Sequence, residues 1–183
     1  MAVQSSMLDL GTSAPPFALP DPAGAIHSID DFAASPALLV AFICNHCPYV
    51  VHIADAFAAF ARDYQPRGLA IVAISSNDIA TYPQDAPDKM ALFAKQHGFN
   101  FPYLFDETQN IARAYDAVCT PDLYLFDASR KLAYRGQFDD TRPKSGATPT
   151  GADLRAATDA LLTGAMPSAD QKPSVGCSIK WKA

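Results

Sequence analysis

The sequence is short of charge, of glycine and of long apolar stretches. Charged residues make up 18% of its 183 positions, and glycine occurs 9 times against 15 prolines. The apolar run Ala37–Cys44 is far shorter than the ~20 residues that a membrane-spanning helix needs, so we expect no contact with a membrane. The net charge is −5, which argues against a nucleic-acid-binding surface.

The N-terminus lacks the features of an export signal. Residues 1–10 contain neither Lys nor Arg and no apolar block, so we expect a cytoplasmic protein. The 4 cysteines are too few for a disulfide-stabilised secreted scaffold. With 49% apolar residues the chain can bury a hydrophobic core, and its length suits one domain.

Two continuous apolar runs predict neighbouring strands. Ala37–Ile43 and Leu69–Ile74 each suit a strand buried on both faces, and the segment between them has apolar residues at helical spacing up to Tyr64. Two strands joined by a helix run parallel in one sheet. Leu123–Phe126 and Lys131–Gly136 predict a hairpin that adds two more strands.

Three further helices are expected. Met90–His97 place apolar residues on one face before Gly98, and Asp106 is expected to cap a helix that follows it. Ala152–Leu162 predict the last helix. The order of elements predicts an α/β fold with a mixed sheet.

Cys44 and Cys47 are separated by two residues and follow the first apolar run directly. A helix N-terminus carries partial positive charge and unpaired N–H groups, which lower the pKa of a thiol placed there. We expect Cys44 to lie nearer these groups and to attack a disulfide, and Cys47 to resolve the mixed disulfide. His46 is expected to add positive charge near the Cys44 thiolate, so the predicted catalytic residues are Cys44, Cys47 and His46.

The segment Ile43–Pro48, together with Thr120 and Pro121 before a later strand, resembles the thioredoxin-like superfamily over about residues 12–163. The resemblance implies a three-layer fold, with a mixed central sheet flanked by helices. It also implies that Pro121 is a cis-proline that packs against the cysteine pair. If the next strand runs antiparallel beside the first, Thr120 could offer its backbone to a substrate strand.

Other segments resemble one branch of that superfamily. Ala14–Leu19 and Ile26–Ile29 resemble the redoxin branch, which contains the alkyl hydroperoxide reductase/thiol-specific antioxidant family. Gly176–Trp181 resembles an uncharacterised peroxiredoxin-like subgroup. We therefore expect a redoxin domain over residues 12–165, with an N-terminal arm at 1–11 and a C-terminal tail at 166–183.

The chain departs from the sequence patterns of both peroxiredoxins and thioredoxins. Peroxiredoxins carry Pro-x-x-x-Thr-x-x-Cys, and with their cysteine on Cys47 the proline position holds Val40 and the threonine position holds Cys44. The arginine that orients peroxide has no counterpart near Cys119. Thioredoxins have Trp before the first cysteine and a buried Asp six residues before it, where this chain has Ile43 and Leu38.

Three functional hypotheses follow. The first is a thiol–disulfide oxidoreductase without cofactor or bound metal, acting on a protein or small-molecule disulfide or thiol. The second is a thiol peroxidase of the redoxin type. The third is a zinc- or copper-binding module, although zinc sites need four ligands and Cys119 and Cys177 are isolated in the sequence. The sequence leaves the oligomeric state open.

Several other residues remain candidates. Cys119 is interpreted as a small buried residue, and Cys177 either as a tail anchor or as a third redox thiol that reaches the pair. Arg142 follows the hairpin, in a loop expected near the site. His97 is expected to satisfy the last carbonyls of its helix, and Ser75–Asp78 to lie at the rim of the pocket or to turn the chain.

Overall fold

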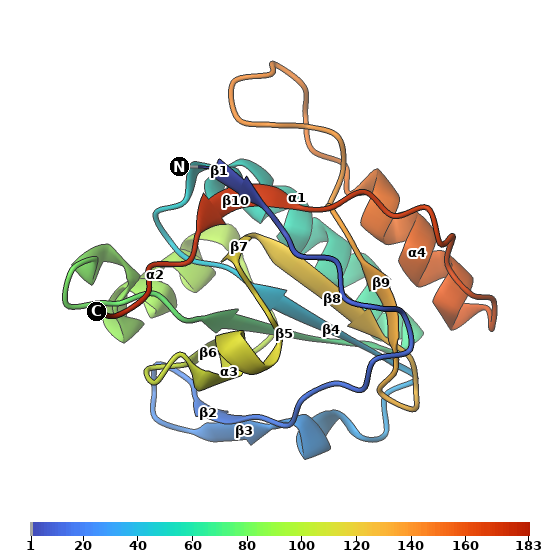
Figure 1. The fold of residues 1–183 in the computed structure, drawn as a ribbon, viewed down its shortest axis with the longest axis horizontal. Helices are drawn as coiled ribbons and strands as arrows, with labels where there is room; N and C mark the ends of the chain where they lie inside the picture. The colour runs from blue at the N-terminus through green and yellow to red at the C-terminus, as the bar shows by residue number, and fades with distance from the viewer. Residues whose placement is uncertain (1) are drawn as a thin grey trace.

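The central element of this computed structural model is a five-stranded mixed sheet, seen obliquely in Figure 1; the structure describes residues 2–183. The strand order is β6-β5-β4-β8-β9. Strands β6, β5 and β4 run parallel to one another, β8 runs antiparallel to β4, and β9 runs antiparallel to β8. Their bounds are β4 (Ala37–Phe42), β5 (Leu69–Ser75), β6 (Tyr103–Phe105), β8 (Asp122–Phe126) and β9 (Leu132–Arg135).

Both faces of this sheet are covered. Leu39 and Ala41 of β4 belong to a core shared with residues of three helices, α1 (Pro48–Tyr64), α2 (Pro87–His97) and α4 (Ala152–Leu162). Leu38, Val40 and Phe42 point to a second core, which includes residues of the short helix α3 (Asn110–Ala114) and of β2 (Ala18–Pro20). All of β4 is buried, as expected for a strand between two layers. The predicted three-layer α/β fold is confirmed.

Smaller elements complete the chain. Strand β2 pairs with β3 (Ile26–Ser28), and 3₁₀ helices span Ile29–Phe32, Gln65–Arg67 and Pro83–Asp85.

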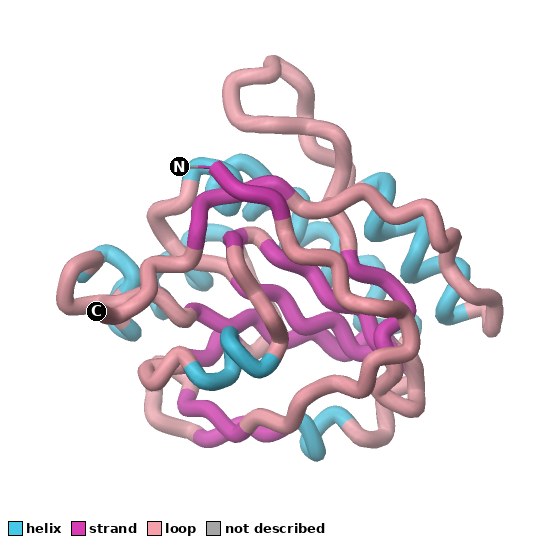
Figure 2. Tube along the Cα trace, viewed as in Figure 1, coloured by secondary structure: helices cyan, strands magenta, loops and turns pink. Residues whose placement is uncertain are grey.

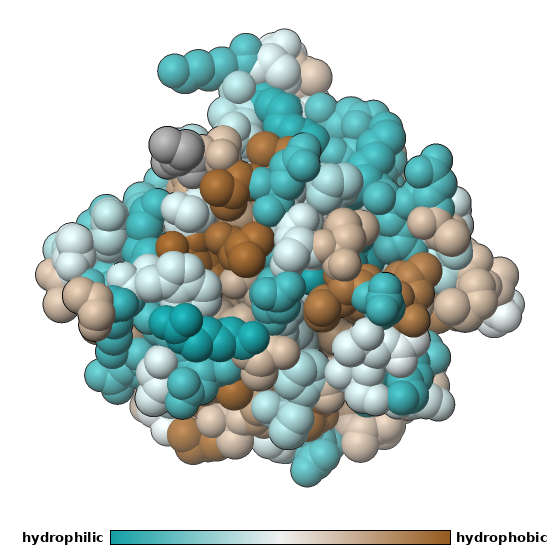
Figure 3. Space-filling model, in the orientation of Figure 1, coloured by the Kyte–Doolittle hydropathy of each residue, from teal (hydrophilic) through white to brown (hydrophobic). Residues whose placement is uncertain are grey.

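Over residues 2–183, no helix has the length and apolarity needed to cross a bilayer. Figure 3 shows apolar side chains interspersed with polar ones on the face that carries both termini.

A second sheet joins the two ends of the chain. Strand β10 (Val175–Ser178) lies between β1 (Ala2–Gln4) and β7 (Cys119–Thr120), antiparallel to both. Figure 2 shows these strands along one side of the molecule, over an end of the main sheet. The sequence analysis did not predict this sheet. The predicted boundaries of the redoxin domain, residues 12 and 165, stay a prediction. The predicted N-terminal arm and C-terminal tail supply β1 and β10, which pack on the domain through β7.

One predicted helix starts later than expected. The helix α3 begins at Asn110, and its N-cap is Gln109 in the left-handed conformation, with φ 63°, rather than Asp106. The Asp106 carboxylate still accepts a hydrogen bond from the Ala112 amide in the first turn of α3, and a second from Ser76 Oγ, 2.9 Å each. Asp106 therefore binds the start of the helix from three residues before the N-cap.

Candidate active site

The two central cysteines lie between β4 and α1. Strand β4 ends at Phe42, and Cys44 follows two residues later. Cys47 is the N-cap of α1, and Pro48 occupies the first helical position, where the missing N–H costs no helical hydrogen bond. The side chains of both cysteines are buried, and all four cysteines of the chain are free thiols.

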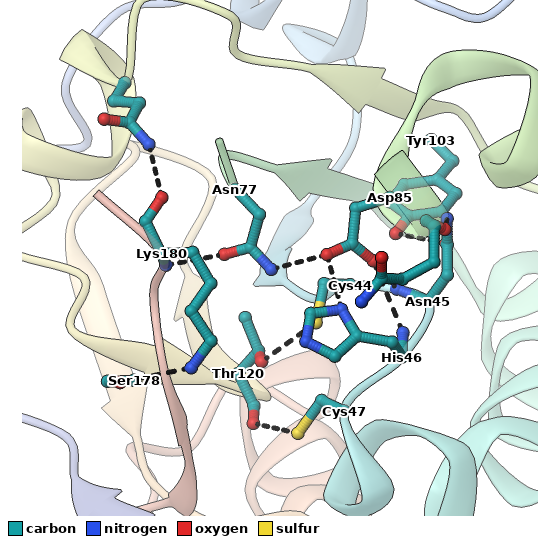
Figure 4. A network of polar contacts seen from close by, with 12 residues as sticks. Cys44, Asn45, His46, Cys47, Asn77, Asp85, Tyr103, Thr120, Ser178 and Lys180 are labelled. Atoms are coloured by element: carbon teal, nitrogen blue, oxygen red, sulfur yellow. Dashed lines mark hydrogen bonds and ion pairs between the residues drawn. The ribbon is translucent and has the colours of Figure 1, made fainter. Parts of the chain in front are cut away.

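The Thr120–Pro121 peptide bond is cis, as the resemblance predicted, and it brings Thr120 against both sulfurs. Thr120 Oγ1 lies 3.4 Å from Cys44 Sγ, and the Cys47 thiol donates to the Thr120 carbonyl oxygen over 3.1 Å. Figure 4 shows Thr120 facing both cysteines, with its hydroxyl directed to one sulfur and its carbonyl oxygen to the other. One residue of the cis-proline loop therefore holds both thiols in place.

The two thiols differ in acidity. The pKa of Cys47 is lowered to about 5, first by a hydrogen bond from the Cys44 thiol and further by the Cys177 thiol and by the Val50 and Cys177 amides, although burial opposes the shift. The contact with the Thr120 carbonyl also opposes it, because only the protonated thiol can donate there. The pKa of Cys44 is raised, because its thiol donates to Cys47 and because it is buried near Asp85.

This result corrects the placement expected from the sequence. Cys44 was expected to lie nearer the helix amides, but the helix begins at Pro48, so Cys47 occupies the helix end and Cys44 lies in the loop before it. The position of the helix start decides which sulfur lies nearer the free N–H groups. Cys47 is therefore the more acidic thiol of the pair, and which thiol attacks and which resolves stays a prediction.

Asp85 is a site residue that the sequence analysis missed. Its carboxylate is fully buried and accepts four hydrogen bonds: from the Asn45 amide (2.8 Å), the His46 amide (3.3 Å), His46 Nδ1 (2.6 Å) and Asn77 Nδ2 (2.8 Å). Figure 4 shows it beside the loop that joins the two cysteines. Asp85 thus fixes the backbone of that loop. Its only sequence signal is its place in the long loop after Ser75.

His46 is held in one orientation. Nδ1 donates to Asp85, and the ring stacks on Tyr82 with 5.5 Å between centroids and 5° between planes. Side-chain atoms of Cys44, His46 and Asp85 all lie within 4.8 Å of one another. A histidine that is oriented by a carboxylate and lies beside a thiol of raised pKa is placed to accept the proton of that thiol.

The same three side chains would have to supply any metal site here, and they suit one poorly. A metal ligand needs a free lone pair, but both oxygens of Asp85 already accept hydrogen bonds from N–H groups. Cys47 faces the Thr120 carbonyl oxygen, so Cys44 and His46 Nε2 are the two ligand atoms left free here, fewer than the four that a zinc site needs. The geometry favours thiol chemistry over zinc or copper binding.

Replacing Asp85 by Asn is expected to destabilise the site. The amide group of Asn would face N–H donors, so at least one buried hydrogen bond is lost, and we expect the free energy of unfolding to fall by about 1–3 kcal/mol. Urea denaturation measures the change. The matched control is Asp88→Asn, because Asp88 is exposed and pairs only with Lys89; equal losses in both variants would contradict the role of Asp85.

The remaining candidates have partners of their own. The Cys119 thiol points to the Pro121 carbonyl oxygen at 3.6 Å, and burial raises its pKa, so it is chemically quiet. The Arg142 guanidinium bonds Gln137 and carbonyl oxygens of its own loop. His97 donates to Asp55 rather than to helix-end carbonyls, which corrects that expectation. Within Ser75–Asp78, Asn77 joins the Asp85 network.

Comparison with known proteins agrees with this architecture. The model of the AhpC/TSA family matches residues 10–135. The chain belongs to the AhpC/TSA family. This redoxin has the thioredoxin-like fold: it superposes with TM-score 0.61 on the thioredoxin domain of a thiol-disulfide oxidoreductase from Bacteroides vulgatus, at 16% identity, covering 81% of this chain and 97% of that one.

Two further relatives are nearer in sequence. A hypothetical protein from Sinorhizobium meliloti is 52% identical, with a TM-score of 0.97 and 98% of each chain covered. A Mycobacterium tuberculosis protein named "Putative peroxiredoxin" is 27% identical over 66% of this chain and 72% of its own length. Membership of the AhpC/TSA family indicates a redox enzyme of the thioredoxin-like kind.

Proposed function

We propose that this redoxin is a thiol–disulfide oxidoreductase in which Cys44 and Cys47 alternate between dithiol and disulfide. The observation that carries the proposal is the pairing of a low-pKa thiol, Cys47, with a hydrogen-bonded second thiol, Cys44, at a helix N-terminus beside a cis-proline loop. Low-pKa thiols in such surroundings are typical of disulfide exchange centres.

The exchange takes two displacement steps. The Cys47 thiolate attacks one sulfur of a substrate disulfide, which forms a mixed disulfide and releases the other substrate sulfur as a thiolate. Cys44 then passes its proton to the His46–Asp85 pair and attacks Cys47 Sγ, which forms the Cys44–Cys47 disulfide and releases the second substrate thiol. The reverse sequence oxidises a dithiol.

The proposed substrates are disulfides or thiols of proteins or small molecules. Both sulfurs of the pair are buried, and β10 covers the backbone of Thr120 that was expected to receive a substrate strand. A substrate must therefore displace β10 or be small. The role of Thr120 and Pro121 in binding substrate stays a prediction.

Catalysed reduction of insulin by dithiothreitol tests the proposal. We expect the wild-type protein to accelerate insulin precipitation well above a Cys44→Ser control, because that variant cannot close the internal disulfide. Precipitation at the same rate with both proteins would contradict the proposed activity on protein disulfides.

A thiol peroxidase is the second candidate, favoured by the ionised Cys47 and by the "Putative peroxiredoxin" relative. Val40 and Cys44 still occupy the positions where the peroxiredoxin pattern has proline and threonine. Hydroperoxide consumption that survives Cys44→Ser but not Cys47→Ser would support this candidate.

A further inference from the structure

Strand β10 places a third cysteine at the exchange centre. In the antiparallel pairing of β10 with β7, Cys177 lies directly opposite Thr120, the residue whose carbonyl oxygen accepts the Cys47 thiol. Cys177 is one of the partly buried residues that pack against the core cluster containing Cys47, and its thiol and backbone N–H help to lower the pKa of Cys47. Cys47 therefore has one thiol neighbour on its own loop and another on the C-terminal strand.

Gly176 allows β10 to lie close to the backbone of Thr120. A Cβ added to Gly176 would lie 1.9 Å from the Thr120 carbonyl oxygen, so no other residue fits there without moving the strand. On the opposite side β1 pairs with β10, with Val3 opposite Gly176. The position of Cys177 is therefore set by two strands.

The segment after β10 is tied to the active-site network. The Lys180 amide donates to Asn77 Oδ1 over 2.8 Å, and Asn77 in turn donates to Asp85, as Figure 4 shows. The Lys180 carbonyl oxygen accepts from Gln109 Nε2, also over 2.8 Å, and Ile179 is buried in the second core. These contacts hold Cys177 in register with Thr120.

Cys177 is also the more accessible sulfur. It is only partly buried, whereas Cys44 and Cys47 are fully enclosed. Its strand pairs with Thr120 along the backbone edge where a visiting substrate strand was expected to bind. Strand β10 thus occupies the place of a substrate strand and brings Cys177, a cysteine of the same chain, next to Cys47.

We propose that Cys177 is a third redox-active thiol, which exchanges with the Cys44–Cys47 pair and forms an intrachain Cys47–Cys177 disulfide. The proposal rests on the proposed function, since it uses the same Cys47 sulfur. It gives the protein two alternative disulfides, of which the second locks β10 onto the cis-proline loop.

The exchange is an isomerisation and needs no external oxidant. Starting from the Cys44–Cys47 disulfide, Cys177 Sγ attacks Cys47 Sγ; the bond between Cys44 and Cys47 breaks as the bond between Cys47 and Cys177 forms. The proton that Cys177 loses ends on Cys44. One disulfide and one thiol are present before and after the step, so no net electrons are transferred.

Disulfide mapping tests the proposal. The full-length protein is oxidised with diamide, quenched in acid, alkylated with N-ethylmaleimide and digested without reductant, and its peptides are identified by mass spectrometry. In Cys44→Ser we expect Cys47–Cys177 as the main disulfide, and in Cys177→Ser only Cys44–Cys47. Cys119→Ser is the matched control and should keep both.

A second variant separates proximity from general reactivity. Gly176→Val should push β10 away from Thr120, so in an otherwise wild-type chain we expect the Cys47–Cys177 peptide to vanish while Cys44–Cys47 still forms. Circular dichroism checks that the variant is folded. If Cys47 and Cys177 both stay free in oxidised Cys44→Ser, under conditions that fully oxidise Cys177→Ser, the proposal is wrong. That outcome would leave the proposed Cys44–Cys47 activity intact. If instead both disulfides are mapped but the protein does not reduce insulin, only the proposed function is wrong.

Discussion

Replacing Cys47 by Ser is expected to lower catalysed insulin reduction by at least about 100-fold, to the rate of dithiothreitol alone. Cys47 is the more acidic thiol of the pair, because the donors around it lower its pKa to about 5. A serine hydroxyl at this position stays protonated and cannot attack sulfur, so the first displacement is lost outright.

Cys44→Ser is expected to fail at a different step. Its Cys47 can still attack the substrate, so in protein with the additional Cys177→Ser change a mixed disulfide with the substrate should accumulate and be visible as an adduct in intact-mass measurements. Cys119→Ser should keep wild-type activity, because that thiol is buried and bonded to the Pro121 carbonyl oxygen. The opposite result would reverse the assignment of roles: an adduct on Cys44 in the Cys47→Ser variant, and no adduct on Cys47 in the Cys44→Ser variant.

Replacing Arg135 by Ala is expected to lower the free energy of unfolding by about 3–5 kcal/mol. Arg135 Nη2 lies 3.2 Å from Asp122 Oδ2, both side chains are fully buried, and the guanidinium carbon lies 4.5 Å from the centroid of the Tyr124 ring. Burial raises the pKa of Asp122 to about 6 even with the arginine in place. Without Arg135 the carboxylate would be an uncompensated buried charge, and the loss would be a large part of a typical stability of ~5–15 kcal/mol.

A double variant checks the physical reason. Arg135→Met together with Asp122→Asn removes both charges and keeps similar volumes, and Asn can still accept from the Val118 amide and the Tyr124 hydroxyl that contact Asp122. We expect it to be more stable than Arg135→Met alone in guanidinium denaturation, because that single variant has the same packing at position 135 but leaves the Asp122 carboxylate unpaired. If Arg135→Met alone were as stable as the double variant, lost packing and not an unpaired charge would explain the loss in Arg135→Ala.

The sheet could be predicted from the sequence because its strands carry local signals. Ala37–Phe42 is a continuous apolar strand, and β8 and β9 are joined by a short polar turn, as predicted. The cysteine pair was found for the same reason: the end of an apolar run, two cysteines and a proline stand within a few residues of each other. Strand β4 ends at Phe42 and α1 begins at Pro48, which leaves the pair at the junction.

The features that the sequence did not reveal depend on contacts between distant residues. Strand β10 has four residues and pairs with β7, which is more than fifty residues earlier and has only two, so neither has enough length for a periodic pattern. Asp85 is one of several acidic residues in a polar loop, and only the folded chain shows that it accepts four hydrogen bonds at the site. The acidity of Cys47 depends on donors from Cys44, Val50 and Cys177, and the last of these reaches it only through the pairing of β10.

The most direct test of the account is a redox titration of the Cys44–Cys47 pair. The protein carrying Cys119→Ser and Cys177→Ser is equilibrated in glutathione buffers of graded potential, quenched in acid and analysed for free thiols and disulfide-linked peptides. The account predicts one two-electron transition, in which both thiols are lost together and a single Cys44–Cys47 peptide appears. Thiols that stay free across the whole range, or stable glutathione adducts in place of the internal disulfide, would contradict it.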